Sequence, residues 1–384
     1  MNHNWNPTKL SDLLKSVVRP VRLDFATTYR LLGAHWYAKG LYVKEEKKGS
    51  EIRATSLFKV KEGDFVYNRL FAWKGSFAVA TKDVDGCLVS NEFPCFTVRT
   101  DLAHPKYLWL YFSREISWNE ALGLSTGSTP TSRNRLKEPQ FLDMEIQLPP
   151  LDEQCRIVFR MEELGGRLHE ARQLRQESHE ASSRFITSLH LHLSGPRMIP
   201  LRDVLRLDER RISVSADGKY PQVGIRGFGG GLFGRGALEG TQTTYKEFNL
   251  LFDGALVLSQ VKGWEGAVAV CGKAFAGWYA SPEYRTFSFI PDQAIPEYMS
   301  AIVTTSWFYG KLADLTRGVG ARRERTRPEA FLEIVIPMPT VEQQRDALRV
   351  FDKLELLKLL QTETALELDA LAPSILAKAF SGEL

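Results

Sequence analysis

An internal repeat constrains the fold of this chain more than any other feature of its sequence. When the sequence is shifted by 191 positions, residues 8–107 align with residues 199–298 without a gap, and 24 of these 100 positions are identical. Chance alone does not give this level of identity over such a stretch, so the two segments are expected to fold alike. The identical pairs include Leu10/Leu201, Tyr29/Tyr220, Gly33/Gly224, Trp73/Trp264, Gly75/Gly266 and Phe96/Phe287.

A long helical pattern follows each repeat. In the last stretch of the chain, apolar residues recur mostly three or four positions apart, Thr340 and Gln343 form a capping box, and Gly382 ends the run. This pattern predicts one helix of roughly 40 residues, about 60 Å long at 1.5 Å per residue. A helix of that length usually has a partner along its side.

An earlier copy of the pattern is the expected partner. It starts after Pro150 and ends at Ser194-Gly195-Pro196. At a constant offset of 189 residues, Gln154 in the first copy matches Gln343 in the second. The two copies are expected to pack against each other in antiparallel orientation, although Gln361 and Thr364 interrupt the apolar stripe in the middle of the second copy.

Short β-branched or aromatic runs separated by Gly and Pro predict strands in both repeats. The expected strands cover 64–70, 76–80, 86–90, 93–98 and 144–148, with counterparts at 255–261, 267–271, 277–281, 285–290 and 333–338. One amphipathic helix is expected in each repeat, starting near Pro105 and Pro296. The predicted fold class is therefore α+β, with two tandem strand-rich domains in pseudo-twofold repeat, separated by two long antiparallel coiled-coil helices. The predicted boundaries are 1–148 and 196–338 for the domains and 149–195 and 339–384 for the helices.

The composition is that of an ordinary globular protein, with 43% hydrophobic and 25% charged residues and a net charge of only +4. No signal-like apolar region opens the chain and no run approaches the length of a membrane span, so the chain is expected to be soluble and cytoplasmic. The four cysteines are scattered without a CxxC pair, which predicts reduced and mostly buried thiols. They are Cys87, Cys95, Cys155 and Cys271.

Motifs of catalysis are missing. Residues 229–234 fit GxGxxG, but further glycines follow them in place of a helix, which argues against a dinucleotide site. Phosphate-loop, amino-methyltransferase, PD…(D/E)xK nuclease and HExxH patterns do not occur, and no histidine lies beyond His192. His190 and His192 are expected at the surface or between helices. The sequence predicts a chain that is not an enzyme and carries no metal or cofactor.

An arginine-rich loop at the same place in both repeats points to binding of nucleic acid. Gly-rich turns, short hydroxyl side chains and arginines suit contacts with phosphates, and arginine also binds the O6 and N7 of guanine. The residues expected to contact DNA in this loop are Arg317, Gly318, Arg322, Arg323, Arg325 and Arg327 in the second repeat, and Thr126, Gly127, Ser128, Thr129, Arg133 and Arg135 in the first.

A second candidate surface lies at a strand end, at residues 68–74 and 259–265. The predicted DNA contacts here are Arg69, Lys74 and Lys262, with Arg226 in the glycine-rich stretch of the second repeat. Trp73 and Trp264 are expected in the core, since both repeats retain them while their neighbours differ. If both repeats bind DNA, identical positions are expected to be scaffold and divergent loop positions to read different sequences.

Three motifs resemble those of the specificity subunit of type I restriction–modification enzymes, and the resemblance extends over essentially the whole chain. They are the start PPLDEQCRI at 149–157, the TGSTP loop at 126–130 and the closing SILAKAFSGEL at 374–384. The first helix departs from the family pattern in ending SLHLH at 188–192. The second loop has Gly318-Val319-Gly320-Ala321 in place of GSTP, which leaves the DNA contacts of that loop open.

The resemblance implies a non-catalytic reader of double-stranded DNA in which target-recognition domains 1 and 2 each bind one half of a split site. The long helices would set the distance between the halves and dock two modification (methyltransferase) subunits that carry S-adenosylmethionine. Restriction subunits, which use ATP and Mg²⁺, would complete the nuclease. The alternative is a non-catalytic scaffold that binds protein partners or RNA. Salt dependence separates the two, because neutralisation of DNA phosphates makes affinity fall steeply with salt.

Overall fold

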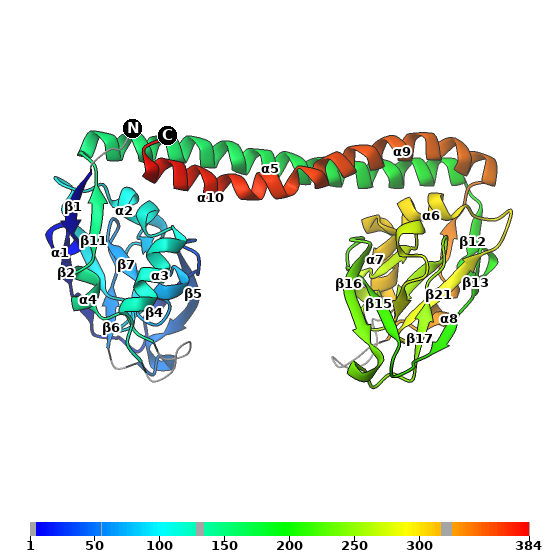
Figure 1. Cartoon of the computed structure of the whole chain (residues 1–384), viewed down its shortest axis with the longest axis horizontal. Coiled ribbons are helices and arrows are strands. Elements are labelled where there is room, and N and C mark those ends of the chain that lie inside the picture. Colours follow the sequence, from blue (N-terminus) through cyan, green and yellow to red (C-terminus); the bar gives the residue numbers. More distant parts are fainter. Residues whose placement is uncertain (1–4, 55, 128–133, 316–324, 384) are drawn as a thin grey trace. The chain divides into compact units, whose positions relative to one another are not determined.

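The computed structural model describes residues 5–383 apart from 55, 128–133 and 316–324. The chain forms two compact units, one of Met1–Ala171 with Ala365–Leu384 and the other of Arg172–Thr364. The boundary between them falls within the long helix α5 (Leu151–Ser194). In each unit a globular part made of strands and short helices lies beside a pair of helices (Figure 1).

Two main sheets and a short strand pair form the globular part of the first unit. The four-stranded sheet has the order β2 (Leu14–Val17), β10 (Cys95–Val98), β7 (Phe65–Tyr67) and β8 (Phe77–Val79). The five-stranded sheet has the order β3 (Pro20–Val21), β6 (Leu57–Lys59), β9 (Leu88–Ser90), β4 (Thr28–Ala34) and β5 (Leu41–Lys48). Strand β1 (Asn6–Lys9) pairs with β11 (Glu145–Leu148).

The helices of the first globular part cover the four-stranded sheet, and aromatic side chains fill the space between them. They are α1 (Leu10–Leu13), α2 (Pro105–Tyr111), α3 (Glu115–Leu124) and α4 (Glu138–Leu142), with 3-10 turns η1 (Gly49–Glu51), η2 (Ala72–Lys74) and η3 (Lys82–Val84). Phe141 of α4 is fully buried among the rings of both sheet and helices. Burial of large aromatic side chains is the main source of stability in such a core.

The second unit repeats this arrangement element by element. Its four-stranded sheet has the order β13 (Leu205–Leu207), β21 (Tyr284–Phe289), β18 (Leu256–Ser259) and β19 (Val268–Val270). Its five-stranded sheet has the order β14 (Arg211–Ser213), β17 (Glu247–Leu250), β20 (Tyr279–Ala280), β15 (Lys219–Ile225) and β16 (Leu232–Glu239). Strand β12 (Met198–Pro200) pairs with β22 (Val335–Pro337). The helices are α6 (Pro296–Val303), α7 (Ser306–Asp314) and α8 (Pro328–Leu332), with η4 (Leu201–Asp203), η5 (Gly240–Gln242), η6 (Gly263–Glu265) and η7 (Lys273–Phe275). The identical strand orders confirm the internal repeat and the α+β class.

Two features of the globular parts differ from the expectation. The single amphipathic helix predicted in each repeat is two helices, α2 with α3 and α6 with α7, although Pro105 and Pro296 do begin the first of each pair. The hairpins β4–β5 and β15–β16 were not predicted, and neither were the short strands β1, β2, β3 and β6 of the first unit and β12, β13, β14 and β17 of the second. The glycines at 229–231 lie in the turn of the second hairpin, so the GxGxxG match is no dinucleotide loop.

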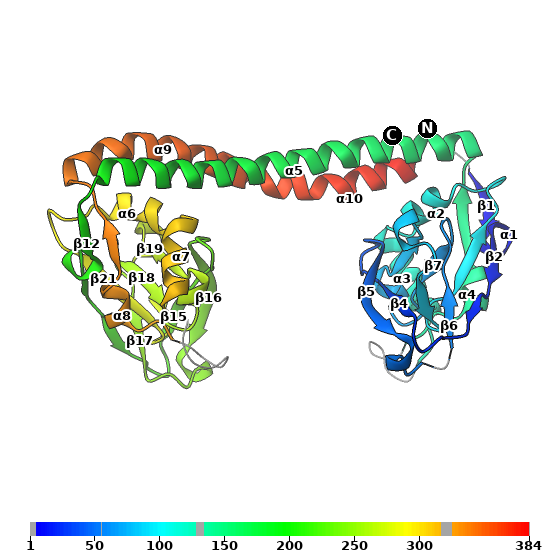
Figure 2. The same cartoon turned by 180° about the vertical axis from the view of Figure 1, so that it is seen from behind.

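Within each unit, half of α5 pairs with part of the carboxy-terminal stretch. In the first unit α10 (Ala365–Ser381) lies along the amino-terminal half of α5, and in the second α9 (Val341–Glu363) lies along its carboxy-terminal half (Figure 1 and Figure 2). The second pairing is antiparallel, since Ser178 bonds Gln361 at 3.1 Å while Leu189 packs in the core that contains Ala347. The expected pairing of the two helical copies is confirmed in this form.

The expectation of one uninterrupted carboxy-terminal helix is wrong, because a break at Thr364 separates α9 from α10. Arg175 of α5 donates to the Gln361 carbonyl oxygen at 3.3 Å and to Thr364 Oγ1 at 2.6 Å. A side chain that binds such a carbonyl competes with the helix's own hydrogen bonding, which is a known cause of helix interruption. Gly382, with a φ of 76°, ends α10 as predicted.

A buried glutamine joins each long helix to its globular part. The Gln154 amide accepts from the His104 backbone N–H and donates to the carbonyl oxygens of Leu102 and Pro149. Gln344 makes the same three bonds, with Ile295, Gln293 and Pro339. The helical copies therefore correspond at an offset of 190, and the offset of 189 that matched Gln154 with Gln343 is wrong. Gln343 instead forms the predicted capping box with Thr340.

The cysteines are free thiols, and all except Cys155 are buried. Burial raises the pKa of Cys95 to about 12 and that of Cys271 to about 11, which keeps both thiols protonated. In the part of the chain that the structure describes, no helix is long and apolar enough to cross a membrane. Nor do the described His, Cys, Asp and Glu side chains gather into a group of three that could hold a metal ion.

A buried histidine makes the second unit sensitive to acid. His190 of α5 lies between helices, with Nδ1 2.7 Å from the Tyr298 hydroxyl, and its side chain is fully buried. Burial disfavours the charged imidazolium and lowers the pKa of His190 from 6.5 to about 4. The unfolded chain binds more protons than the folded chain between these two pH values. Stability is therefore expected to fall as the pH drops from 6.5 to 4.

Replacement of this histidine tests that expectation. His190→Gln is expected to remove the acid-dependent loss contributed by this group, about 2 kcal/mol between pH 7 and pH 4.5 for a pKa lowered from 6.5 to about 4. The measurement is the free energy of unfolding of both proteins by denaturant at pH 7 and pH 4.5. All other titrating groups are common to the two proteins, so the difference between their pH profiles reports on His190. Parallel profiles would contradict the assignment.

Candidate nucleic-acid interface

The arginine-rich loop of the first unit closes on a short pair of backbone hydrogen bonds. Thr126 and Arg135 face each other across the loop, with N–H···O distances of 3.1 and 3.0 Å. The next residue, Leu136, donates its N–H to the Arg69 carbonyl oxygen at 3.0 Å and accepts from the Tyr67 hydroxyl at 3.0 Å. The base of the loop is thereby fastened to the end of strand β7, which is the second surface predicted from the sequence.

The second unit repeats the backbone bond between the loop end and the strand end. Thr326 donates its backbone N–H to the Gln260 carbonyl oxygen at 2.9 Å. Gln260 occupies the position of Arg69, so both predicted surfaces meet at one place in each unit. In the first unit that place brings together Arg69, Thr126 and Arg135. In the second unit Lys262 lies two residues after Gln260, and Arg325 directly precedes Thr326.

An arginine at the end of the loop pairs with a glutamate that both repeats retain. Arg135 lies 2.8 Å from Glu92, and Arg325 lies 2.9 Å from Glu283. Both guanidinium groups are about half exposed. An exposed ion pair of this kind contributes little to stability. It does hold the guanidinium in one direction while leaving donors free for a ligand, since arginine has five N–H donors.

Arg69 is held by the protein itself. Its guanidinium binds both oxygens of the Glu138 carboxylate and the Asn91 carbonyl oxygen, and less than a quarter of the side chain is exposed. These contacts occupy most of its donors, so Arg69 acts first as a link between strand β7 and helix α4. Lys262 is more exposed and lies 3.4 Å from Glu265, while Arg327 is exposed and directly precedes α8.

The tip of hairpin β4–β5 lies next to η2, which is part of the second predicted surface. Lys74 of η2 places Nζ 3.7 Å from the ring centroid of Trp36 at the tip. The prediction that both repeated tryptophans are core residues is wrong for Trp264, which is 47% exposed, while Trp73 is half-buried. The reason is local: in the 3-10 turns that carry them, the side toward the core is occupied by Ala72 and Gly263.

A stacked pair on each hairpin explains one identical glycine. Tyr42 of the first hairpin packs so closely over Gly33 that an added Cβ would lie 2.6 Å from its ring, and Phe233 does the same over Gly224. On these rings lie the residues at the first tip position, His35 at 4.2 Å from the Tyr42 centroid and Arg226 at 4.7 Å from the Phe233 centroid. The scaffold is the same in both units, whereas the side chain that it presents differs. His35 was not among the predicted contacts, although its alignment with Arg226 could have indicated it.

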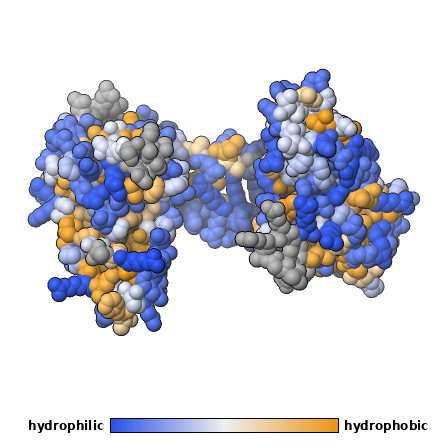
Figure 3. Space-filling model, turned by 90° about the horizontal axis from the view of Figure 1, so that it is seen from below, coloured by the Kyte–Doolittle hydropathy of each residue, from blue (hydrophilic) through white to orange (hydrophobic). Residues whose placement is uncertain are grey.

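Part of the predicted site lies outside the residues that the structure describes. These positions are Ser128, Thr129, Arg133, Arg317, Gly318, Arg322 and Arg323. The structure describes the other predicted positions. In the first unit these lie around η2 and the loop base, and they are Arg69, Lys74, Thr126, Gly127 and Arg135. In the second unit they are Arg226, Lys262, Arg325 and Arg327. Their contacts with DNA stay a prediction. Seen from below, hydrophobic and hydrophilic residues are interleaved over the globular part of each unit (Figure 3).

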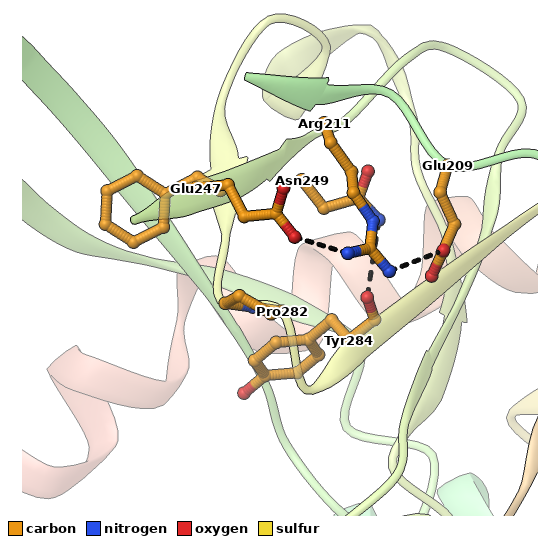
Figure 4. A pocket seen from close by; sticks show the side chains of 7 residues that line it. Glu209, Arg211, Glu247, Asn249, Pro282 and Tyr284 are labelled. Atoms are coloured by element: carbon orange, nitrogen blue, oxygen red, sulfur yellow. Dashed lines mark hydrogen bonds and ion pairs between the residues drawn. The ribbon is translucent and has the colours of Figure 1, made fainter. Parts of the chain in front are cut away.

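A polar pocket in the second unit has a different character. The Arg211 guanidinium lies between the carboxylates of Glu209, at 3.0 Å, and Glu247, and Asn249 Nδ2 donates to the Tyr284 carbonyl oxygen at 3.3 Å (Figure 4). The two carboxylates neutralise the arginine. The first repeat has Val18, Pro20 and Ser56 at the positions of the three charged residues, so this cluster is particular to the second unit.

Comparison with known proteins agrees with the fold. Residues 2–177 match the family model described as the type I restriction modification DNA specificity domain. A solved structure described as showing complex assembly and conformational transition of the type I R-M system covers 99% of this chain and 98% of its own, at 18% identity and a TM-score of 0.65. The crystal structure of the HsdS subunit from Thermoanaerobacter tengcongensis covers 99% and 97%, at 18% identity and a TM-score of 0.53. No curated protein sequence matches the chain.

The repeated α+β units with their paired helices thus share the fold of these two solved structures. Over residues 2–177 the sequence is similar to the type I restriction modification DNA specificity domain. The alternative of a scaffold for protein or RNA is not favoured.

Proposed function

We propose that each unit of this chain reads one half of a bipartite DNA site and that the paired helices set the spacer between the halves. The observation that carries the proposal is the repeated backbone bond at the loop base, with an arginine held by a glutamate at the same place in both units. Side chains that differ between the units, such as His35 and Arg226, are presented on a common scaffold. Two copies of one scaffold with different side chains suit two half-sites of different sequence.

We infer that the chain is the DNA sequence-specificity subunit of a type I restriction–modification complex, and the proposed partners follow from that assignment. Two modification subunits would dock on the helices and supply methyl transfer from S-adenosylmethionine, and restriction subunits would supply cleavage with ATP and Mg²⁺, on cytoplasmic DNA. The chain itself would be non-catalytic. Exposed leucines along α9, including Leu356, Leu357 and Leu360, support a protein partner on the helix pair, because apolar side chains in water favour contact with a partner.

Selection from random DNA duplexes tests the proposal. With the methyltransferase partner present, the complex is expected to enrich a bipartite site with a spacer of constant length and unspecified sequence. Enrichment of one contiguous site, or of none, would contradict it. The logarithm of the affinity should also fall linearly with the logarithm of the salt concentration, with a slope that counts the neutralised phosphates. Affinity that does not respond to salt would favour a protein or RNA scaffold instead.

Removal of the paired arginines is expected to weaken binding at the half-site of the unit that carries them. Arg135→Ala and Arg325→Ala should each cost about 1–3 kcal/mol of binding free energy, as for an arginine that contacts a base. The measurement is equilibrium binding to the selected duplex and to variants with one half-site scrambled. Arg99→Ala is a matched control, since Arg99 is an equally exposed arginine paired with Asp101. Unchanged affinity in both variants would place the DNA surface elsewhere.

A further inference from the structure

Both hairpin tips carry an aromatic residue in a backbone conformation that such residues rarely adopt. Tyr37 has a φ of 60° and Phe228, at the equivalent position, has a φ of 53°. A non-glycine residue in this region costs of order 1–3 kcal/mol and persists only where its surroundings enforce it. Glycine would adopt the same conformation without the cost. The retention of a large ring in both repeats therefore calls for a reason other than the turn itself.

Neighbouring elements hold the two residues in place. Tyr37 donates its backbone N–H to the Lys74 carbonyl oxygen at 2.7 Å, and Phe228 donates to the Glu265 carbonyl oxygen at 2.6 Å. Each ring leans on one aromatic side chain of the adjacent helix: Tyr37 on Trp118 and Phe228 on Tyr309, with centroid distances of 5.6 and 6.0 Å.

Those two helix side chains explain another pair of identical glycines. An added Cβ on Gly75 would lie 2.4 Å from Trp118, and one on Gly266 would lie 2.4 Å from Tyr309. Both glycines also have a φ of 72°. The whole support of the ring, from the 3-10 turn to the helix, is thus repeated in the two units.

The supported rings are nevertheless exposed to solvent. Tyr37 is 56% and Phe228 65% exposed, so burial in the core does not account for their conservation between the repeats. Beside Tyr37 an open cleft of about 300 Å³ is lined by His35, Trp36, Lys39 and Tyr42. Basic side chains border both tips, with Lys74 over Trp36 in the first unit and Arg226 over Phe233 in the second.

Exposed aromatic rings interleaved with cations suit one ligand chemistry in particular. Nucleic-acid bases stack on aromatic side chains, and the neighbouring cations bind the phosphate backbone. In the proposed function, some bases of the half-site lose a stacking neighbour and can stack on such a ring. A DNA methyltransferase takes its target base out of the duplex, which leaves the adjacent bases without a stacking neighbour.

We infer that Tyr37 and Phe228 each stack on a base left without a stacking neighbour in the half-site of their own unit. This inference rests on the proposed function, and it assigns to the hairpin tips a role separate from the arginine loops. The strained backbone and its repeated support then serve to fix the direction of the ring before DNA arrives. A ring held in advance loses less conformational freedom on binding.

The test uses the complex of the full chain with its methyltransferase partner and the bipartite duplex selected by wild type. Tyr37→Gly and Phe228→Gly relieve the strain, so neither is expected to lower the thermal stability of the chain. Each is expected to weaken DNA binding about 5- to 150-fold, the effect of losing one base–aromatic stack. A merely structural role for the ring predicts the opposite pattern, with lower stability and unchanged affinity, and that result would overturn the inference.

An abasic scan locates the contact. Duplexes that lack one base at a time are bound to wild type and to Tyr37→Gly. At one position of one half-site, base removal should weaken wild type but leave the variant nearly unaffected, because both changes remove the same stack. Phe228→Gly should lose its sensitivity to base removal at one position of the other half-site. Tyr37→Phe keeps an aromatic ring and should bind as wild type does. Additive losses at every position would overturn the inference. Failure of wild type to bind any bipartite site would instead contradict the proposed function.

Discussion

Removal of one heptad from each of the paired helices is expected to shorten the preferred DNA spacer by about three base pairs or to abolish binding. Seven residues of helix span about 10.5 Å, and one base pair spans about 3.4 Å of duplex. In the second unit Arg175 contacts Thr364 and Ser178 contacts Gln361, so residues 175–181 and 358–364 are matched segments. Deletion of whole heptads keeps the same faces of the helices in contact. Selection of duplexes from a random pool measures the spacer directly.

Insertion of a heptad into each helix at the same points is the matched control, with an expected change of opposite sign. Both variants retain the loops and the hairpin tips, so the two half-site sequences are expected to stay as in wild type. An unaltered spacer in either variant would refute the role of the helices as a ruler.

Phe141→Ala is expected to destabilise the first unit by about 3–5 kcal/mol, the range for truncation of a fully buried phenylalanine. The ring of Phe141 lies 4.6 Å from that of Tyr67 and 5.5 Å from those of Phe96 and Phe112, and Phe65 also packs on it. Its loss leaves a cavity that these large rings fill only in part. The measurement is the free energy of unfolding by denaturant, read at the transition of the first unit.

The equivalent substitution in the second unit is a comparison for Phe141→Ala. Phe331 occupies the equivalent position, but it has Leu256 and Leu258 around it in place of Phe65 and Tyr67. Phe331→Ala should also destabilise, and the more flexible aliphatic neighbours are expected to relax further into the space. A loss in Phe141→Ala smaller than about 1 kcal/mol would contradict the view that the aromatic cluster is closely packed.

The repeat explains why so much of the fold could be predicted from the sequence. Every strand predicted in one repeat has an observed strand at its place, because the runs were short, apolar and bounded by glycine or proline. The hairpins β4–β5 and β15–β16 escaped prediction. Their sequences are rich in charged residues in the first repeat and in glycine in the second, so no common pattern of alternation marks them. Yet these hairpins carry the strained aromatic residues.

The long helices were likewise predicted in part. The apolar period predicted two long helices and their pairing, since a long amphipathic stripe needs a partner. It did not predict the break at Thr364, where Arg175 binds from another helix, 189 positions earlier in the chain. It also misplaced the match of Gln154 by one residue, since Gln343 and Gln344 are adjacent and only the three buried hydrogen bonds of Gln344 distinguish them.

What the sequence by itself determined is the architecture: two copies of an α+β domain, two long helices and a basic loop in each copy. These follow from periodicity and repetition, which are local properties of the chain. Only the tertiary structure decided which arginines are held by a glutamate, as Arg135 and Arg325 are, and which is held within the protein, as Arg69 is. It alone placed Tyr37 and Phe228 at the surface. The physical reason is that exposure and hydrogen bonding depend on residues that lie far away in the sequence and meet only in the folded protein.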